Sequence, residues 1–568
     1  MDWISLRSLS RSRLVKDAQD DTRRNHPKNR QILQTRMSLE NAISLMNSGT
    51  GCSYDVVIVC TSDDFQADYW NRRLSLGICS KSVVDESSFP MVLAVSEDWS
   101  AGGAGNGLGT LYAFQKACNL AQSKYGVDLL ATLGEKAISA ALYHTAGKGT
   151  RMAPLPASEN NNKPAVRLPA TVGVGGEKVP MTVLEAVIKQ TSVYAPSRKG
   201  RLSVFWGDQV FIPSSSTLYT PNFHVDIMCT LGKMVGAEEW KEKGLEKYGV
   251  IAVGQSGEAA QVEKVDHSTA VEMLKSLGDV EKVGPSLGSF SMSAEMVGAL
   301  TQEYKSELDQ RAGKFDTDPH FWMPMTLSKA DYAKLMVGKG VTPEIATSHY
   351  ERMEAFKLAF AGSSKNAEMG LFGAVDVGSK ACWWDYGQLK LYSCNNLKML
   401  EDSEDASLLR SFMGATSRVM DSTCGDAMVD KESCMFSSKL SEGSISGSIL
   451  SGVNSKSVVA DGAILVNVSA SKIRAAKGSI LYNVVDDSEE GIVVGEGEVL
   501  VGVFQSDGNF VNVKSSISID GGKAWKEIIG GNSQSFEDIH LANKNANVTA
   551  IEDARNARHE KVTKSLWI

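Results

Sequence analysis

The sequence predicts an α/β protein whose doubly wound, largely parallel sheet is followed by a C-terminal β-solenoid. The β-branched runs YDVVIVC (54–60) and MVLAV (91–95) suit buried parallel strands, and the helical stretch FQADYWNRRLSLG lies between them. The alternation continues through ISAALYHTAG, the helical segment MTVLEAVIKQTSVYA and RLSVFWGDQVF, so the α/β body is expected to reach about residue 400.

Beyond residue 400 the composition shifts to Ser, Gly and isolated apolar residues. These apolar residues recur at irregular intervals, at Ile445, Ile449, Val453, Val458, Ile464, Ile473 and Ile480, and GIVVGEGEVLVGVF follows. This pattern is typical of the short rungs of a β-solenoid. A β-sandwich gives short strands at similar spacing, so that alternative stays open.

These shifts predict five segments. They are a polar N-terminal tail and helix (1–50), an α/β catalytic domain (51–400), a linker (401–440), a β-solenoid domain (441–535) and a C-terminal cap or tail (536–568). A chain of 568 residues is long enough for two or three units, each with its own apolar core.

Composition narrows the class of protein. The chain is 42% hydrophobic and 22% charged, as globular proteins are, and its formal net charge of -8 argues against a nucleic-acid binder. No apolar run approaches the roughly 20 residues that span a bilayer, and the opening has no secretory core. Nine cysteines without CxxC or zinc spacing indicate thiols in a reducing compartment. We therefore expect a cytoplasmic protein with no membrane partner; the Arg- and Ser-rich opening leaves an organelle transit peptide open.

The strongest motif is the glycine-rich loop HTAGKGTRMAPLPASENNNKPAV (144–166), which follows a predicted strand. Gly147 and Gly149 let the backbone wrap closely around phosphates, whose charge Lys148, Arg151 and Lys163 would offset. A strand that runs into such a turn presents its N–H groups at the carboxyl edge of the sheet. The loop therefore predicts a triphosphate site.

On these residues the sequence resembles the sugar-1-phosphate nucleotidyltransferases, also called NDP-sugar pyrophosphorylases. The family signature is G-x-G-T-R followed by a proline and a lysine, here Gly147, Gly149, Thr150, Arg151, Pro154 and Lys163. The resemblance implies a Rossmann-like nucleotide-diphospho-sugar transferase domain followed by a left-handed β-helix-like solenoid. It also implies an Mg²⁺-dependent reaction between an NTP, GTP or UTP, and a sugar 1-phosphate. Whether the chain forms a homo-oligomer through the solenoid stays open.

The same resemblance implies roles for other residues. VFWGDQVF and WWDYGQLKLYSCNN supply the metal carboxylates Asp208 and Asp385, and Arg151 and Lys163 are the catalytic cations. The expected nucleotide-binding residues are Gly107, Gly109, Thr110, Gly147, Lys148, Gly149 and Thr150. The expected sugar-binding residues are Glu263, Lys264, Gly288 and Phe290. A hard cation takes oxygen ligands, often one or two carboxylates plus substrate phosphates, which fits the two aspartates.

One branch of the family, the fucose-1-phosphate guanylyltransferases, also places a glycine-rich segment before the triphosphate loop. The residues consistent with that branch are Tyr54, Asp55, Gln66, Ala67, Gly107, Gly109, Thr110 and Leu111. In most family members the Leu-Gly-Thr segment comes after the loop, whereas here Leu108 to Thr110 precede Gly147. GDP-fucose synthesis is a lead on this ground, and neither the base nor the sugar follows from the residue types.

Three other functions were weighed. A regulatory or scaffold protein that binds NDP-sugars without chemistry would be expected to lack Arg151, Lys163 or the two aspartates, and all are present. The scattered histidines lack zinc spacing, and His320 in KFDTDPHFWMPMTL is better explained as part of a packed turn than as a ligand. Acyl transfer by the solenoid lacks a base, because no histidine lies between residues 350 and 539.

Overall fold

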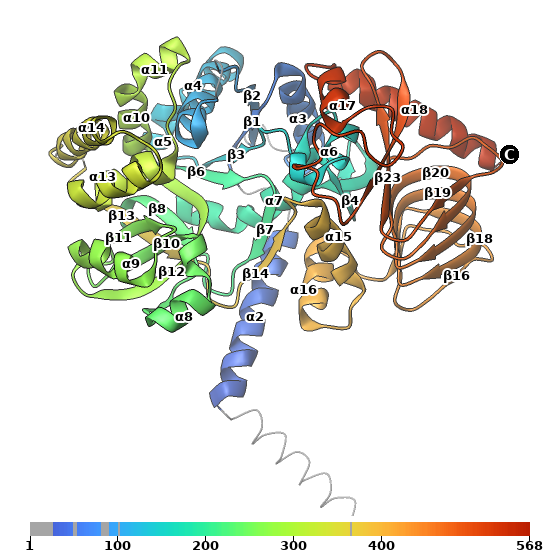
Figure 1. Ribbon diagram of the computed structural model, residues 1–568, viewed down its shortest axis with the longest axis horizontal. Coiled ribbons are helices and arrows are strands. Elements are labelled where there is room, and N and C mark those ends of the chain that lie inside the picture. Colours follow the sequence, from blue (N-terminus) through green and yellow to red (C-terminus); the bar gives the residue numbers. More distant parts are fainter. Residues whose placement is uncertain (1–26, 49–53, 81–89, 100–102, 364–365, 568) are drawn as a thin grey trace, which may run out of the picture.

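A computed structural model describes residues 27–48, 54–80, 90–99, 103–363 and 366–567. Figure 1 shows an α/β body beside a ladder of C-terminal strands, with the long helix α2 (Pro27–Asn47) projecting from the body. The expected tail at 1–26 lies outside the described residues. In the part that the structure describes, no helix is long and apolar enough to cross a membrane.

The body is built on a large mixed sheet in the order β11-β10-β12-β6-β3-β1-β2. Its central strands are parallel: β1 (Val56–Thr61) pairs with β2 (Met91–Ser96) and β3 (Ala140–His144), and β3 pairs with β6 (Arg201–Trp206). The doubly wound part was expected to be largely parallel, but beyond β6 the sheet is mainly antiparallel, although β13 pairs with β8 in parallel. The remaining strands of this sheet are β8 (Phe223–Cys229), β9 (Gly232–Lys233), β10 (Gly249–Gly254), β11 (Ala259–Glu263), β12 (Val280–Ser293) and β13 (Gly370–Asp376).

Both faces of the sheet are covered, which explains the continuous apolar runs of its central strands. On β1, Val57 and Val59 join a core cluster with α2, α3 and α7, whereas Val56 and Ile58 join a second cluster with α4, α5 and α10. These helices are α3 (Asp64–Leu76), α4 (Gly105–Tyr125), α5 (Leu129–Gly134), α7 (Val183–Thr191) and α10 (Ala294–Glu303).

Other body elements are shorter or peripheral. Two small antiparallel sheets pair β4 (Arg167–Val174) with β5 (Glu177–Thr182) and β7 (Gln209–Ile212) with β14 (Cys382–Asp385). The other helices are α6 (Leu155–Ser158), α8 (Ala237–Glu242), α9 (His267–Met273), α11 (Lys305–Gln310), α12 (Met323–Thr326), α13 (Lys329–Gly338), α14 (Pro343–Ala361) and α15 (Leu389–Leu397).

The C-terminal part is a ladder of mainly parallel strands. Ile449 of β19 pairs with Ile464 of β20, which pairs in turn with Ile480 of β21, so apolar side chains stack from one strand to the next. The strands are β15 (Val419–Met420), β16 (Met428–Val429), β17 (Cys434–Phe436), β18 (Lys439–Ser446), β19 (Ile449–Asp461), β20 (Ile464–Ala475), β21 (Ile480–Tyr482), β22 (Ile492–Val494), β23 (Glu498–Phe504) and β24 (Phe510–Ser516). The last pair, β23 and β24, is antiparallel.

Residues 401–440 do not form the expected linker. They form α16 (Glu404–Met413) and the first strands of the ladder, β15 to β17. The short apolar pairs Val419–Met420 and Met428–Val429 were too brief to be recognised as strands in the sequence. Two further helices follow the ladder, α17 (Phe536–Ala542) and α18 (Val548–Leu566).

The ladder packs directly on the body. Ile449, Ile464 and Ile480 belong to the same buried cluster as Trp70 and Leu155 of the body. Helix α18 lies against both β20 and α3, as Figure 1 shows at the upper right. This shared core fixes the ladder beside the glycine-rich loop.

Candidate active site

The parallel strands end at one edge of the sheet, and polar residues follow each of them. Glu97 follows β2, His144 ends β3, and Gly207 and Asp208 follow Trp206 at the end of β6. A cavity of about 580 Å³ opens at this edge. Its lining residues are Glu97, Gly103, Ala104, Gly105, Asn106, His144, Thr145, Ala146, Gly147, Lys163, Pro164, Trp206, Gly207, Asp208 and Gln209. In open α/β sheets this edge is where ligands bind.

Asp208 and Asp385 lie side by side, although 177 positions separate them in the chain. Their strands β7 and β14 are paired, with Asp385 opposite Gln209, and the Tyr386 N–H donates to the Asp208 carbonyl at 3.0 Å. The Asp385 carboxylate also accepts from the Gly387 N–H at 2.6 Å. The β7–β14 pairing therefore brings the two predicted metal carboxylates to one place.

Lys163 completes this cluster. Its Nζ donates to Asp208 Oδ2, and a Cβ placed on Gly387 would lie 2.8 Å from Asp385 Oδ1, 3.2 Å from Asp208 Oδ2 and 3.6 Å from Lys163 Nζ. Burial raises the pKa of Asp385, as does the nearby Asp208 charge, while Lys163 and Arg151 act in the opposite direction. Two carboxylates and a cation thus surround a space that a glycine keeps open.

This donor set fits a divalent cation that prefers oxygen. Two carboxylates converge within a few ångströms of one point, and the remaining ligands of a hard cation would come from substrate phosphates and water. The oxygen donors of Asp208 and Asp385 therefore match the chemistry of such an ion.

The glycine-rich loop lies next to the cluster of Lys163, Asp208 and Asp385. Gly147 and Gly149 adopt φ of 132° and 63°, values that favour glycine, and residues Thr150–Met152 then form a short 3₁₀ turn. Gly147 lines the cavity, whereas Lys148 and Arg151 are exposed beside it. A Cβ on Gly149 would lie 3.0 Å from the Lys163 Cβ, so the glycine lets the two ends of the loop approach.

Residues of the C-terminal part contact the glycine-rich loop and the segment that follows it. A Cβ on Gly521 would lie 2.5 Å from the Thr150 carbonyl, so the segment between β24 and α17 is in close contact with the turn. Glu159, only 3% exposed, bonds to Arg555 of α18, to Arg167 and to the Tyr482 hydroxyl of β21. The segment that leads to Lys163 is therefore attached to both the ladder and α18.

The predicted nucleotide residues of α4 lie behind the residues that line the cavity and do not line it themselves. Gly107, Gly109 and Thr110 are all buried, and the Gly107 N–H donates to the Phe315 carbonyl at 2.8 Å. Thr110 Oγ1 lies 2.8 Å from His144 Nε2, and a Cβ on Gly109 would lie 2.8 Å from Glu97 Oε2. These residues shape the positions of Glu97 and His144.

The predicted sugar residues are divided by the structure. Gly288 has φ of 76° and lies against the Trp206 indole, which lines the cavity. Phe290 does not reach the cavity: it is 1% exposed and packs edge-on against Trp322 in the core, because its position on β12 faces the helices. The Phe290 side chain therefore does not line the cavity, and its expected role at the sugar stays a prediction.

Glu263 and Lys264 form an ion pair of 3.1 Å at the end of β11. The register pairs Glu263 with Gly249, and Val250 with Pro285, so Glu263 lies on the same sheet edge as Gly288 but two strands away. Neither residue is part of the cavity lining.

Glu97, His144, Asn106 and Trp206 line the cavity but were not predicted as site residues. The signal for Glu97 is present in the sequence, because it comes directly after the buried run MVLAVS, as Asp208 comes after a strand. His144 is the first residue of the motif that marked the loop. The rule that locates ligands at strand ends would have found both.

No known protein-family model matches the chain, and no curated protein matches it. Two solved structures of HddC from Yersinia pseudotuberculosis align with it. One, complexed with GMP-PN, is 11% identical and covers 60% of this chain and 96% of its own, with a TM-score of 0.19. The other is 14% identical over 61% of this chain and 99% of its own, also with a TM-score of 0.19. Likeness at this level carries no conclusion about function.

Proposed function

We propose that the chain is a sugar-1-phosphate nucleotidyltransferase that forms an NDP-sugar and pyrophosphate from an NTP, GTP or UTP, and a sugar 1-phosphate. The observation that carries the proposal is the convergence of Lys163, Asp208 and Asp385 on one point beside the glycine-rich loop. Those residues come from three separate parts of the chain. A cation and two carboxylates around an open space are what transfer between phosphates needs.

In this reaction an oxygen of the sugar 1-phosphate attacks the α-phosphorus of the nucleotide. The bond from that phosphorus to the oxygen bridging the α and β phosphates breaks, and pyrophosphate leaves with the electron pair. Attacking and leaving groups are both anionic, so catalysis rests on positioning and charge neutralisation rather than on a general base. Mg²⁺, when bound, would neutralise charge on the phosphates.

Each residue of the cluster would then have one task. Asp208 and Asp385 would hold Mg²⁺, and Lys163, freed from its pairing with Asp208, would bind the reacting phosphates. The exposed Arg151 would contact the leaving phosphates with its forked donors. Gly147 and Gly149 would allow backbone N–H groups to approach the triphosphate.

The division of the chain into catalytic and C-terminal domains belongs to the same proposal. The parallel stacking of β17, β19, β20 and β21 is the pairing that a left-handed β-helix-like solenoid requires. We expect its outer strands to serve as the contact between subunits of a homo-oligomer.

The test is pyrophosphate release with Mg²⁺ over a grid of nucleoside triphosphates and sugar 1-phosphates. One pair should give a strong signal that Asp208→Ala abolishes and Asp461→Ala leaves intact, because Asp461 is exposed on the ladder. Silence with every pair, combined with NDP-sugar binding, would reject catalysis and favour a binding or scaffold protein.

A further inference from the structure

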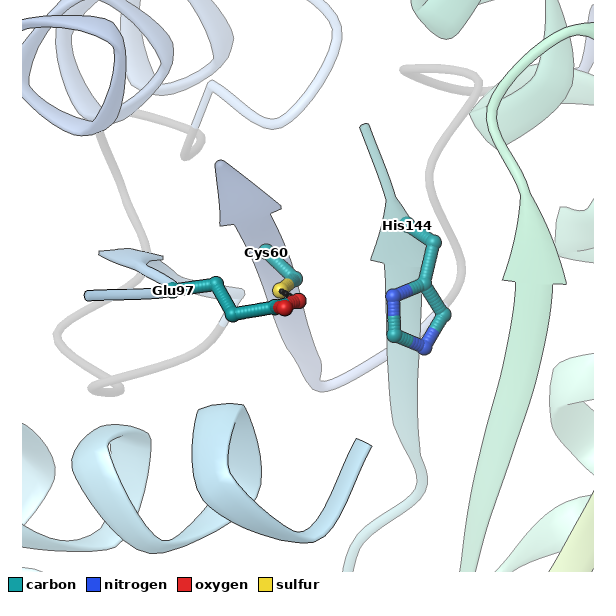
Figure 2. A group of neighbouring side chains, drawn as sticks. All are labelled: Cys60, Glu97 and His144. Carbon is teal, nitrogen blue, oxygen red and sulfur yellow. Dashed lines mark hydrogen bonds between the residues drawn. The ribbon is translucent and has the colours of Figure 1, made fainter. Parts of the chain in front are cut away.

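A half-buried carboxylate that the proposed mechanism does not use lines the same cavity as Lys163. Glu97, Cys60 and His144 come from the ends of β2, β1 and β3, and their ligand atoms lie within 4.8 Å of one another. Figure 2 shows the three side chains converging, with the Glu97 carboxyl group beside the Cys60 sulfur and facing the imidazole. Glu97 and His144 line the cavity.

Among the described residues, no basic side chain pairs with the Glu97 carboxylate. Its carboxylate accepts from the Cys60 thiol at 3.6 Å and from the Ala104 N–H. Lys116 is near, but its Nζ is engaged by Ser96 and by Asp98 at 2.9 Å. Within the described part of the chain Glu97 therefore forms no ion pair, and burial raises its pKa.

His144 adds an acceptor rather than a donor. Thr110 Oγ1 donates to the Asn106 carbonyl at 2.7 Å, so it accepts from the Nε2–H of His144. Burial lowers the pKa of His144 to about 4, which keeps the ring neutral and leaves Nδ1 as an acceptor. Among the described residues, Glu97 and His144 thus present adjacent acceptors to the cavity, and a ligand that binds both must supply its own donors.

A metal ion is a poorer match than such a ligand. Burial raises the pKa of the Cys60 thiol well above its usual range, and that thiol is already a donor to Glu97. His144 Nε2 is held by Thr110. A ligand with two adjacent N–H groups satisfies the carboxylate without removing either contact.

We propose that Glu97 binds the Watson–Crick edge of guanine and so selects GTP as the nucleotide; this rests on the proposed function. Among the common bases only guanine carries two adjacent donors, N1–H and N2–H₂, which match the two carboxylate oxygens. Uracil, cytosine and adenine place an acceptor next to their single donor, and that acceptor would face the charged oxygen. Gly103, Ala104 and Gly105, which lack bulky side chains, leave room beside Glu97 for a planar ring.

The decisive variant is Glu97→Gln, because it exchanges one acceptor for a donor without changing size. Xanthine has the complementary edge, N1–H beside a C2 carbonyl, whereas hypoxanthine only lacks the 2-amino group of guanine. We expect the unaltered chain to prefer GTP over ITP by on the order of 100-fold in kcat/KM for pyrophosphate release. Glu97→Gln should lose a similar factor with GTP and turn over XTP better than GTP.

Glu135→Gln is the matched control, since Glu135 is exposed at the end of α5 and should keep the preference for GTP. A simple loss of fold in Glu97→Gln would lower the rates with GTP and XTP alike. Equal loss with all nucleotides would overturn the proposal, as would a preference of the unaltered chain for UTP or ATP. Stoichiometric Zn²⁺ bound by the unaltered chain and lost in Glu97→Gln, with base preference unchanged, would overturn it in favour of a metal site.

Failure of the proposed function gives a different result. If no sugar 1-phosphate supports pyrophosphate release, equilibrium binding of GDP and XDP to both forms replaces the kinetic comparison. An exchange of preference between GDP and XDP in Glu97→Gln would keep guanine recognition while rejecting the reaction. Equal binding of the two, or none, would reject the guanine site.

Discussion

Glu159 and Arg555 form a buried ion pair, with 3.0 Å between Glu159 Oε2 and Arg555 Nη1, that ties the segment before Lys163 to α18. Burial alone would raise the pKa of Glu159, but Arg555 and Arg167 hold it below its usual range. The same carboxylate accepts from Tyr482 and Asn483 of the ladder. A single buried charge therefore joins three parts of the chain.

Arg555→Ala should destabilise the protein by about 3 kcal/mol, because removing one partner leaves the Glu159 charge incompletely compensated in the core. Chemical denaturation measures the loss. Lys561→Ala is the control, since Lys561 is exposed on the same helix. We also expect a lower kcat in Arg555→Ala at temperatures where it remains folded. Unfolding free energies that match between the two variants would contradict the role of the ion pair.

Gly387→Ala should weaken Mg²⁺ binding while leaving the fold intact. The added methyl would lie 2.8 Å from Asp385 Oδ1 and 3.2 Å from Asp208 Oδ2, in the space where the ion would sit. We expect a rise of at least about 10-fold in the Mg²⁺ concentration for half-maximal activity. Gly338→Ala, where a Cβ meets nothing within 4 Å, is the matched control. An unchanged Mg²⁺ requirement would exclude this space as the metal site.

Asp208→Asn and Asp385→Asn should each lower pyrophosphate release by about 100-fold or more, and the double variant should lose little beyond the worse single one. Both residues would hold the same ion, so their effects cannot be additive. Rates at saturating Mg²⁺ measure this. Two independent losses that multiply in the double variant would mean that the carboxylates do not share a ligand.

Acid should destabilise the fold through buried histidines. Burial lowers the pKa of His559 to about 3, and its ring lies between Ser469 and Asn467 of β20. The unfolded chain takes up this proton near pH 6.5 and the folded chain does not, so stability is lost as pH falls below about 6.5. Each such histidine contributes about 1.4 kcal/mol per pH unit.

Denaturation at pH 7.5, 6.0 and 5.0 would measure this slope, and His559→Gln should reduce it by the contribution of one histidine. Gln keeps polar atoms near Ser469 but does not titrate. A variant with the same pH slope as the unaltered chain would show that His559 is not the group responsible.

The parts of the fold that the sequence predicts best are those governed by local pattern. The strands at 56–61 and 91–96 could be predicted because every residue in them is buried on one face of the sheet or the other, which requires a continuous apolar run. The antiparallel part of the sheet depends on β12, which pairs with the distant strands β6, β8 and β9, and no periodicity encodes these pairings. Val419–Met420 and Met428–Val429 are too short to be distinguished from loop residues until the ladder pairs them.

The candidate site shows the same division. Gly147, Lys163 and Asp208 could be proposed from residue type and their place after strands, and all three line one cavity. The burial of the Phe290 side chain could not be foreseen, because the register of β12 shifts between Ser286 and Phe290. The strand-end rule would have pointed to Glu97, but its position beside Cys60 and His144 is visible only in the fold.

The attachment of Glu159 to α18 also sets an order of events during synthesis. Lys163 emerges from the ribosome long before Arg555, and most of the core of the α/β body has been synthesised by then. Until α18 is made, Glu159 lacks one of its two arginine partners, Arg555. The segment before Lys163 is then not yet attached to α18. We expect a nascent chain to acquire nucleotide turnover only after this helix docks, so that an unfinished body does not consume nucleotide.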